Sequence, residues 1–132
     1  MPLTAPTVGE VILLGHLVNK TSPTDLVLHL FKNNPTITDA TVYGDLTEAT
    51  ETGYAAITLT GASWTITSPG GLGTATYAEQ TFTFTTAASI YGYYVTSTTA
   101  SELLWLEKFS GAPFTLPSGG GTIGITPKLT LD

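Results

Sequence analysis

IYGYYVTSTTASELLWLEKF, residues 90–109, consists of two apolar runs on either side of a short polar connection. In the first run Tyr91, Tyr93 and Val95 occupy every second position, so they would share one side of a strand. A period of two in aromatic and β-branched residues predicts a β-hairpin, here with a loop of about five residues. Both faces of each run are largely apolar, so we expect two strands in the centre of a sheet that is covered on both sides.

Shorter apolar runs, separated by Gly, Pro, Asn and Ser, occupy much of the remaining chain. The clearest of them places Leu26, Leu28 and Leu30 on one face. Runs at intervals of roughly 8–12 residues are typical of a sandwich or barrel. We therefore predict one all-β domain over residues 1–132, an antiparallel, jelly-roll-like β-sandwich of about seven or eight strands. The strands predicted outside the hairpin cover residues 26–32, 54–60, 63–67, 76–86 and 122–131.

The first 19 residues follow a different pattern. Two prolines within residues 1–7 predict an extended N-terminal arm. Thr7-Val8-Gly9-Glu10 fits a capping box, in which Thr7 is the N-cap and Glu10 reaches back to it. Apolar residues then recur with a loose helical period, so we predict a short helix over about residues 8–19.

The composition restricts the classes of partner. Charged residues make up only 11% of the chain, whereas 27 of its 132 residues are threonine, which favours strands and suits a solvated sheet face without charge. Four Lys, no Arg and ten carboxylates give a net charge of −6. Nucleic acids and anionic membranes both attract basic patches, so we expect neither as a partner. Without cysteine the chain forms no disulfide, and no apolar window reaches the length of a membrane-spanning helix.

Few residues are candidates for catalysis or for binding a metal. His16 and His29 are the only imidazoles, and the simpler interpretation of His29 is a half-buried side chain with a satisfied hydrogen bond. A Ser-His-Asp triad assembles through space, so spacing does not exclude one, but no local motif supports it. We expect no enzymatic activity and no cofactor. We interpret the acidic stretch over residues 36–53 as a solvated loop, with a cation site as the alternative; its carboxylates are Asp39, Asp45, Glu48 and Glu51.

The aromatic residues allow two interpretations. Two Trp and six Tyr either line a sugar-binding face or form core and interface anchors. We expect Trp105 and Tyr94 in the core. For Trp64 and Tyr91, core and interface remain equally open.

Four longer segments carry a resemblance to a known family. They are LVLHLFKNNPT (26–36), DATVYGDLTEATETGYAAITL (39–59), IYGYYVTSTTASELLWLEKFSGAPF (90–114) and TIGITPKLTL (122–131). Together they resemble small virion proteins encoded by tailed bacteriophages, and the Y-G-Y-Y-V and L-L-W-L-E-K-F motifs are the most specific. The resemblance covers roughly residues 8–131. Glu51 departs from the pattern, which places an aromatic residue before Thr52-Gly53-Tyr54.

The resemblance implies a virion structural protein without an assigned activity. We expect a capsid decoration (cement) protein that is made in the host cytoplasm, binds the major capsid protein or another virion protein on the capsid exterior, and forms a small homo-oligomer such as a trimer. The alternatives are a tail or head-fibre component, and a carbohydrate-binding module for host recognition. The candidate interface residues are Pro2, Leu3, Pro6, Asp39, Asp45, Trp64 and Tyr91.

Overall fold

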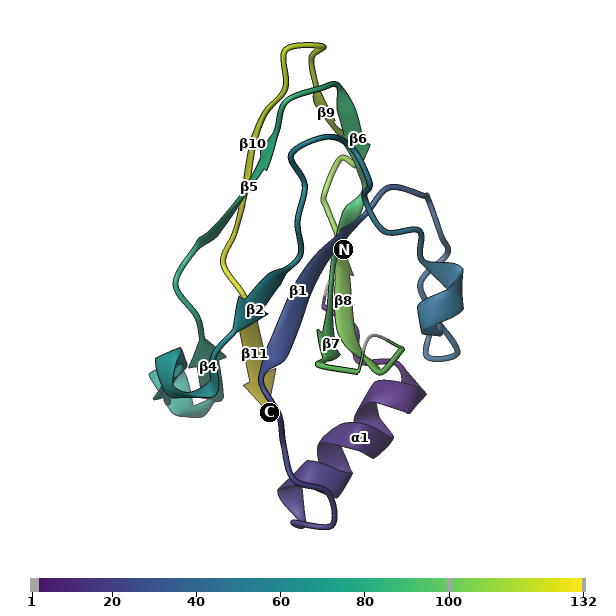
Figure 1. Cartoon of the computed structure of the whole chain (residues 1–132). Coiled ribbons are helices and arrows are strands. Elements are labelled where there is room, and N and C mark those ends of the chain that lie inside the picture. The colour runs from purple at the N-terminus through teal and green to yellow at the C-terminus, as the bar shows by residue number, and fades with distance from the viewer. Residues whose placement is uncertain (1–2, 100, 132) are drawn as a thin grey trace.

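The computed structural model describes residues 3–99 and 101–131. Within these ranges the chain forms one α-helix, three short 3-10 helices and eleven strands (Figure 1). The strands form four antiparallel sheets, and none of these sheets closes into a barrel. The expectation of a β-rich fold with one short helix is confirmed. The expected number of seven or eight strands is too low, because Gly, Pro and polar residues divide the predicted runs into strands as short as three residues.

The elements follow one another in this order. The helix and turns are α1 Thr7–Leu17, η1 Tyr43–Asp45, η2 Gly61–Ser63 and η3 Pro69–Gly71. The strands are β1 Leu26–Phe31, β2 Ile57–Leu59, β3 Thr65–Thr67, β4 Gly73–Thr76, β5 Gln80–Phe84, β6 Ala88–Ile90, β7 Gly92–Ser97, β8 Leu103–Lys108, β9 Phe114–Leu116, β10 Gly121–Ile125 and β11 Lys128–Leu131. The sheets have the orders β2-β1-β7-β8, β10-β5, β11-β4-β3 and β6-β9.

The predicted hairpin is present as β7 and β8, which pair antiparallel with Val95 opposite Trp105. All six residues of β7 are buried, as expected for an interior strand. The prediction that both strands are central is wrong for β8, which is the outer strand of the four-stranded sheet. The N-terminal arm takes up this free edge, because Thr4 and Leu106 exchange two backbone hydrogen bonds of 2.9 Å.

The four-stranded sheet carries a core on each face. On one face Leu28 and Leu30 lie opposite Val95 and Tyr93, and they pack with Phe and Ile side chains from β5 and β10. The other face is covered by the chain between β1 and β2. A second cluster forms there from Phe31, Tyr94, Leu103 and Leu106, against which Ile37, Tyr43 and Leu46 pack. Residues 36–46 therefore cover one face of the sheet, although they were predicted to be part of a solvated loop.

Helix α1 begins one residue earlier than the capping-box prediction requires. Its N-cap is Pro6, which makes no side-chain cap, and Thr7 already belongs to the helix. The prediction of Thr7 as N-cap is wrong because the arm pairs with β8 at Thr4 and delivers the chain to the helix at Pro6. The first turn of α1 also presses against β8, where a Cβ on Gly9 would lie 2.0 Å from the carbonyl oxygen of Leu104.

Candidate functional site

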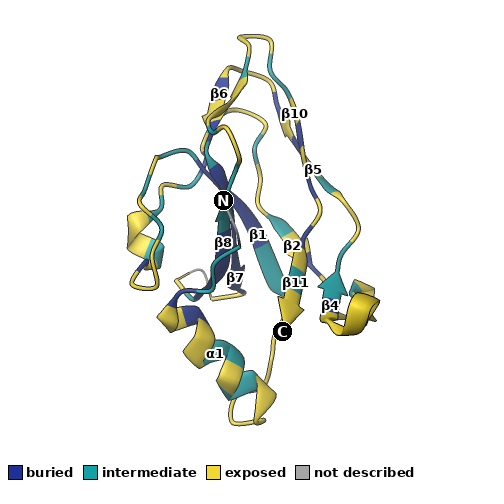
Figure 2. Ribbon diagram, turned by 180° about the vertical axis from the view of Figure 1, so that it is seen from behind, coloured by how far each residue is buried: buried dark blue, intermediate teal, exposed yellow. Residues whose placement is uncertain are grey.

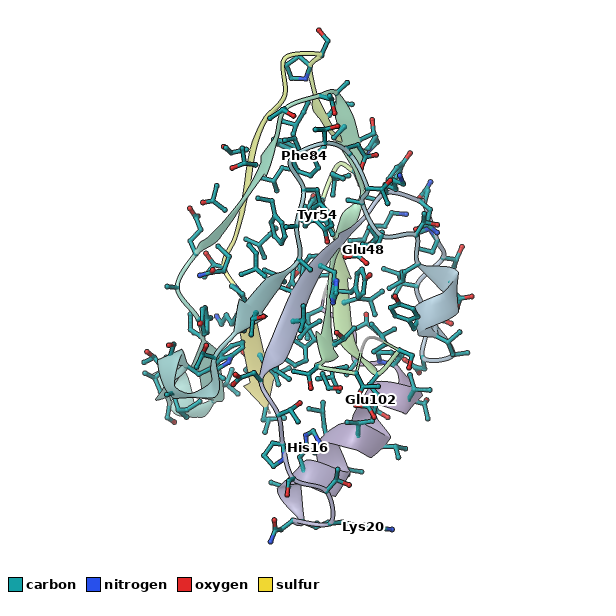
Figure 3. The ribbon with its side chains drawn as sticks, in the orientation of Figure 1. His16, Lys20, Glu48, Tyr54, Phe84 and Glu102 are labelled. Carbon is teal, nitrogen blue, oxygen red and sulfur yellow. The ribbon has the colours of Figure 1, made fainter. Side chains whose placement is uncertain are left out.

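A polar network joins β1 to the segment that follows it. His29 Nδ1 lies 2.8 Å from Glu48 Oε1, and His29 Nε2 lies 3.0 Å from Thr96 Oγ1. The Tyr54 hydroxyl donates to the same Glu48 oxygen at 2.9 Å and accepts the backbone N–H of Leu30 at 3.1 Å. In the tautomer that carries its proton on Nδ1, His29 donates to Glu48 and its Nε2 accepts from Thr96. Glu48 and Tyr54 accordingly meet in the middle of the molecule (Figure 3).

The sheet itself creates the need for this network. Strand β2 pairs with β1 only as far as Leu28, so the next backbone groups of β1 on that edge have no strand opposite them. The Tyr54 hydroxyl accepts the N–H of Leu30, and the N–H of Ala49 donates to the carbonyl of Leu30 at 2.9 Å. Buried backbone groups without a partner are costly. The segment with Ala49 and Tyr54 therefore completes the edge of β1.

The order hydroxyl, imidazole, carboxylate in Thr96, His29 and Glu48 is also the order of a nucleophile-base-acid triad. Thr96 is, however, fully buried, and His29 is 6% exposed. The ring of Tyr94 stacks on His29 with centroids 4.6 Å apart. A substrate has no access to the Thr96 hydroxyl in this arrangement, so the three residues act as a cross-link between strands. The expected hydrogen bond of His29 is confirmed, but the side chain is buried and not half-buried.

Burial also affects the tyrosines around these carboxylates. It raises the pKa of Tyr54 well above its ordinary value of 10.0, and the negative charge of Glu48 raises this pKa further. It likewise raises the pKa of Tyr94, with Glu48 again the next contribution. Tyr93 is buried and donates to Glu107 at 2.9 Å, and both effects raise its pKa. Tyr54 and Tyr93 are therefore structural hydrogen-bond donors, and all three phenols are held in their neutral form.

The acidic stretch does not form one cluster. Glu48 belongs to the buried network, and Asp45 closes the turn η1 by accepting the N–H of Val42 at 2.9 Å. Asp39 is exposed. Within residues 3–99 and 101–131 no three His, Asp or Glu side chains gather as a metal-binding group.

Glu51 is the fourth carboxylate of this stretch, and it is held in place. Its Oε1 lies 3.4 Å from Lys32 Nζ, and its Oε2 accepts the N–H of Thr50 at 2.8 Å. Partial burial works to raise the pKa of Glu51, but the backbone hydrogen bonds and Lys32 outweigh it and hold the pKa below the ordinary value. The interpretation of the whole stretch as solvated is therefore wrong for Glu48 and Glu51.

The aromatic candidates lie against their own chain. Trp105 and Tyr94 are each 1% exposed, so their assignment to the core is confirmed. Trp64 is half-buried and packs edge-on against Trp105 at 6.4 Å and Tyr77 at 5.2 Å. Tyr91 is also half-buried, packs against the second core cluster and lies 5.9 Å from Lys108 Nζ. Neither Trp64 nor Tyr91 presents a free aromatic platform.

The candidate interface residues of the N-terminal arm also pack against the rest of the chain. Leu3 packs against the first core cluster and Pro6 is buried, because the arm lies along β8. Pro2 lies outside the described residues. The arm is therefore part of the fold at Leu3 and Pro6, and their role as interface residues stays a prediction.

Helix α1 exposes apolar side chains to solvent. Four apolar side chains of α1 and that of Val18, directly after it, are between 41% and 77% exposed, beside the exposed Glu10. Figure 2 colours much of this helix as exposed. We call this surface the outer face of α1; it comprises Val8, Val11, Leu14 and Leu17 of the helix together with its C-cap residue, Val18. The opposite side packs inward through Gly9 and Ile12. This exposed surface could have been suspected from the sequence, because a helix with apolar residues on every side is normally buried on every side.

Two hollows flank this helix. The first, of about 260 Å³, lies between α1 and the sheets and is mostly apolar; it is lined by Leu13, His16, Leu26, Leu59, Trp64 and Trp105, among others. The second, of about 240 Å³, lies between α1 and the β7–β8 loop; its lining includes Val11, Gly15, His16, Lys20, Thr21 and Glu102. The buried Nε1 of Trp105 has no hydrogen-bond acceptor among the described residues.

The described part of the chain has no helix that is both long and apolar enough to cross a membrane. No protein-family model matches the chain, and a search of curated proteins finds no match.

Proposed function

We propose that this chain is a non-enzymatic structural protein of a tailed-bacteriophage virion, and specifically a capsid decoration (cement) protein. One observation carries the proposal: apolar side chains remain exposed in two separate parts of the described structure, on α1 and on the sheet β11-β4-β3. Exposed apolar patches of this kind mark surfaces that bind other proteins. The segment resemblance supplies the class of assembly.

The rest of the surface suits such a role. The chain has a net charge of −6 and contains no Arg, so it does not compete for the packaged nucleic acid. Exposed threonines on strands such as β5 keep the remaining sheet faces polar without adding charge. The hydroxyl, imidazole and carboxylate of the buried network serve the fold, which leaves binding as the function that the exposed residues support.

We also infer a two-layer, jelly-roll-like sandwich as the architecture. The four-stranded sheet β2-β1-β7-β8 packs across the first core cluster from the β5–β10 ribbon, whose Phe82, Phe84, Ile123 and Ile125 point into that cluster. Two antiparallel layers around one core are the defining arrangement of a sandwich. The core cluster that the two layers share supports this inference, and the order in which the strands are connected does not enter into it.

The sheet β11-β4-β3 is the surface that we assign to the capsid. The register places Ile66 opposite Ala75 and Leu131 opposite Gly73, so both exposed side chains lie on one face of this sheet. Ile66 and Leu131 are 72% and 71% exposed. Covering them with the surface of a capsid subunit would remove apolar area from water, which favours binding.

The test uses heads of the phage that encodes this chain, prepared without the protein. Wild-type protein should co-sediment with these heads and raise their melting temperature, because a decoration protein bridges neighbouring subunits. Ile66→Asp should weaken co-sedimentation by at least about tenfold, since a charge at an apolar interface must be desolvated. Thr81→Asp, at an exposed position of β5, is the matched control and should bind like the wild type. Heads that bind none of the three proteins would contradict the proposal, as would cryo-electron microscopy density for this chain on the tail alone.

A further inference from the structure

The larger of the two hollows beside α1 lies between this helix and the sheets. We infer that it is a binding site for a small, uncharged, largely apolar molecule that carries one hydrogen-bond acceptor, such as an aryl ketone. This inference goes beyond the proposed place in a virion and does not depend on it.

Segments that are distant in the sequence form the walls of this hollow, namely α1, the strands β1, β2 and β8, and the sheet β11-β4-β3. Ala75 and Leu129 lie opposite each other in the register of β4 and β11, so their side chains leave the same face of that sheet. Both residues line the hollow, which therefore has a sheet as one wall. Trp64 and Trp105 also line it, and their rings meet edge-on with centroids 6.4 Å apart.

The size and the lining of the hollow define the class of molecule that fits. Its volume is about 260 Å³. An apolar cavity of about 150 Å³ already holds benzene, whereas sites for drug-sized ligands begin at about 300 Å³. The hollow therefore suits a single ring with a short substituent. Among the described residues no Lys, Asp or Glu lines it, so an ionised ligand would give up its hydration against a mostly apolar wall.

Trp105 supplies the reason for a hydrogen-bond acceptor on this molecule. Its side chain is 1% exposed, and its buried Nε1 has no acceptor among the described residues. A buried N–H without an acceptor is costly, and native structures rarely leave one in that state. Because Trp105 lines the hollow, an acceptor on a molecule bound there would satisfy the N–H that the described chain leaves unpaired.

The first experiment titrates the isotope-labelled, purified protein with acetophenone, without any heads, and follows the indole N–H signals of its two tryptophans by NMR. Trp64→Phe assigns the signal of Trp105. Acetophenone should shift this signal saturably, because its carbonyl accepts the N–H. α-Methylstyrene, in which a methylene group replaces the carbonyl oxygen, should bind roughly tenfold more weakly, since it lacks one hydrogen bond. Benzoate should bind more weakly still, because its charge must be desolvated.

The second experiment fills the hollow from its sheet wall. Ala75→Leu should weaken acetophenone binding by at least about tenfold and leave the melting temperature unchanged or higher, because the added side chain occupies the same space. Leu129→Phe fills this space from the neighbouring strand and should give the same loss of binding. Ala87→Leu, at an exposed position that does not line the hollow, is the matched control and should bind like the wild type.

Three results would each overturn the inference. They are a Trp105 signal that acetophenone does not shift, equal affinity for acetophenone and α-methylstyrene, and unchanged binding by folded Ala75→Leu or Leu129→Phe. Circular dichroism establishes that the variants are folded. Neither experiment involves heads, so this inference and the proposed place in a virion can fail independently.

Discussion

At the scale of single residues, Glu48 has the largest structural role of the four carboxylates in its stretch. It accepts hydrogen bonds from His29, which is buried, and from Tyr54, which is partly buried. Glu48→Ala should lower the free energy of unfolding by about 1–3 kcal/mol, because it leaves these donors without an acceptor. Equilibrium urea unfolding at neutral pH measures the change.

Two further substitutions make this prediction specific to the network. Glu48→Gln keeps one acceptor oxygen and should therefore cost less than Glu48→Ala. Asp39→Ala removes an exposed carboxylate from the same stretch and should change the free energy of unfolding by no more than about 0.5 kcal/mol. Equal losses for Asp39→Ala and Glu48→Ala would show that the loss reflects net charge and not the hydrogen bonds.

At the scale of secondary-structure elements, the hairpin depends on a close approach at the start of β7. A Cβ on Gly92 would lie 2.2 Å from the carbonyl oxygen of Glu107 on β8 and 2.5 Å from the ring of Phe31 on β1. Gly92→Ala should lower the free energy of unfolding by about 1–3 kcal/mol, because strands on both sides must shift to admit the methyl group. Thermal unfolding followed by circular dichroism measures the effect.

Gly44→Ala is the matched control for this element. No heavy atom lies within 4 Å of the position that its Cβ would occupy, so the melting temperature should stay close to that of the wild type. A Gly92→Ala protein with unchanged melting temperature would mean that β7 and β8 do not pack in the observed register.

At the scale of the whole molecule, the buried phenols link stability to alkaline pH. Folding raises the pKa of Tyr54, Tyr93 and Tyr94 above the ordinary value of 10.0. Their contribution to stability is therefore complete below about pH 10 and is lost as the pH rises above it, because the unfolded chain releases these protons more readily. Absorbance at 295 nm should show that these three of the six tyrosines ionise only as the protein unfolds.

A parallel unfolding signal, such as far-ultraviolet circular dichroism, provides the comparison. In Tyr54→Phe the number of phenols that ionise together with unfolding should fall from three to two. If all six tyrosines of the wild type ionise while the circular dichroism stays native, the phenols are not buried as the structure places them.

Much of the local structure follows from the amino-acid pattern alone. Alternation in residues 90–109 predicted the β7–β8 hairpin, and the apolar runs predicted β1 and helix α1, because side-chain direction follows from the period of the backbone. Burial of Trp105 and Tyr94 was predictable for the same reason.

Which distant segments contact one another is visible only in the folded chain. His29 contacts Glu48, 19 residues away, and Thr96, 67 residues away, and no local pattern encodes such distances. The sequence could not show that the arm would close the edge of β8, or that this docking would orient α1 with one apolar side outward. Whether an apolar side chain becomes core or docking surface depends on what the folded chain places over it, and over the outer face of α1 the described chain places nothing.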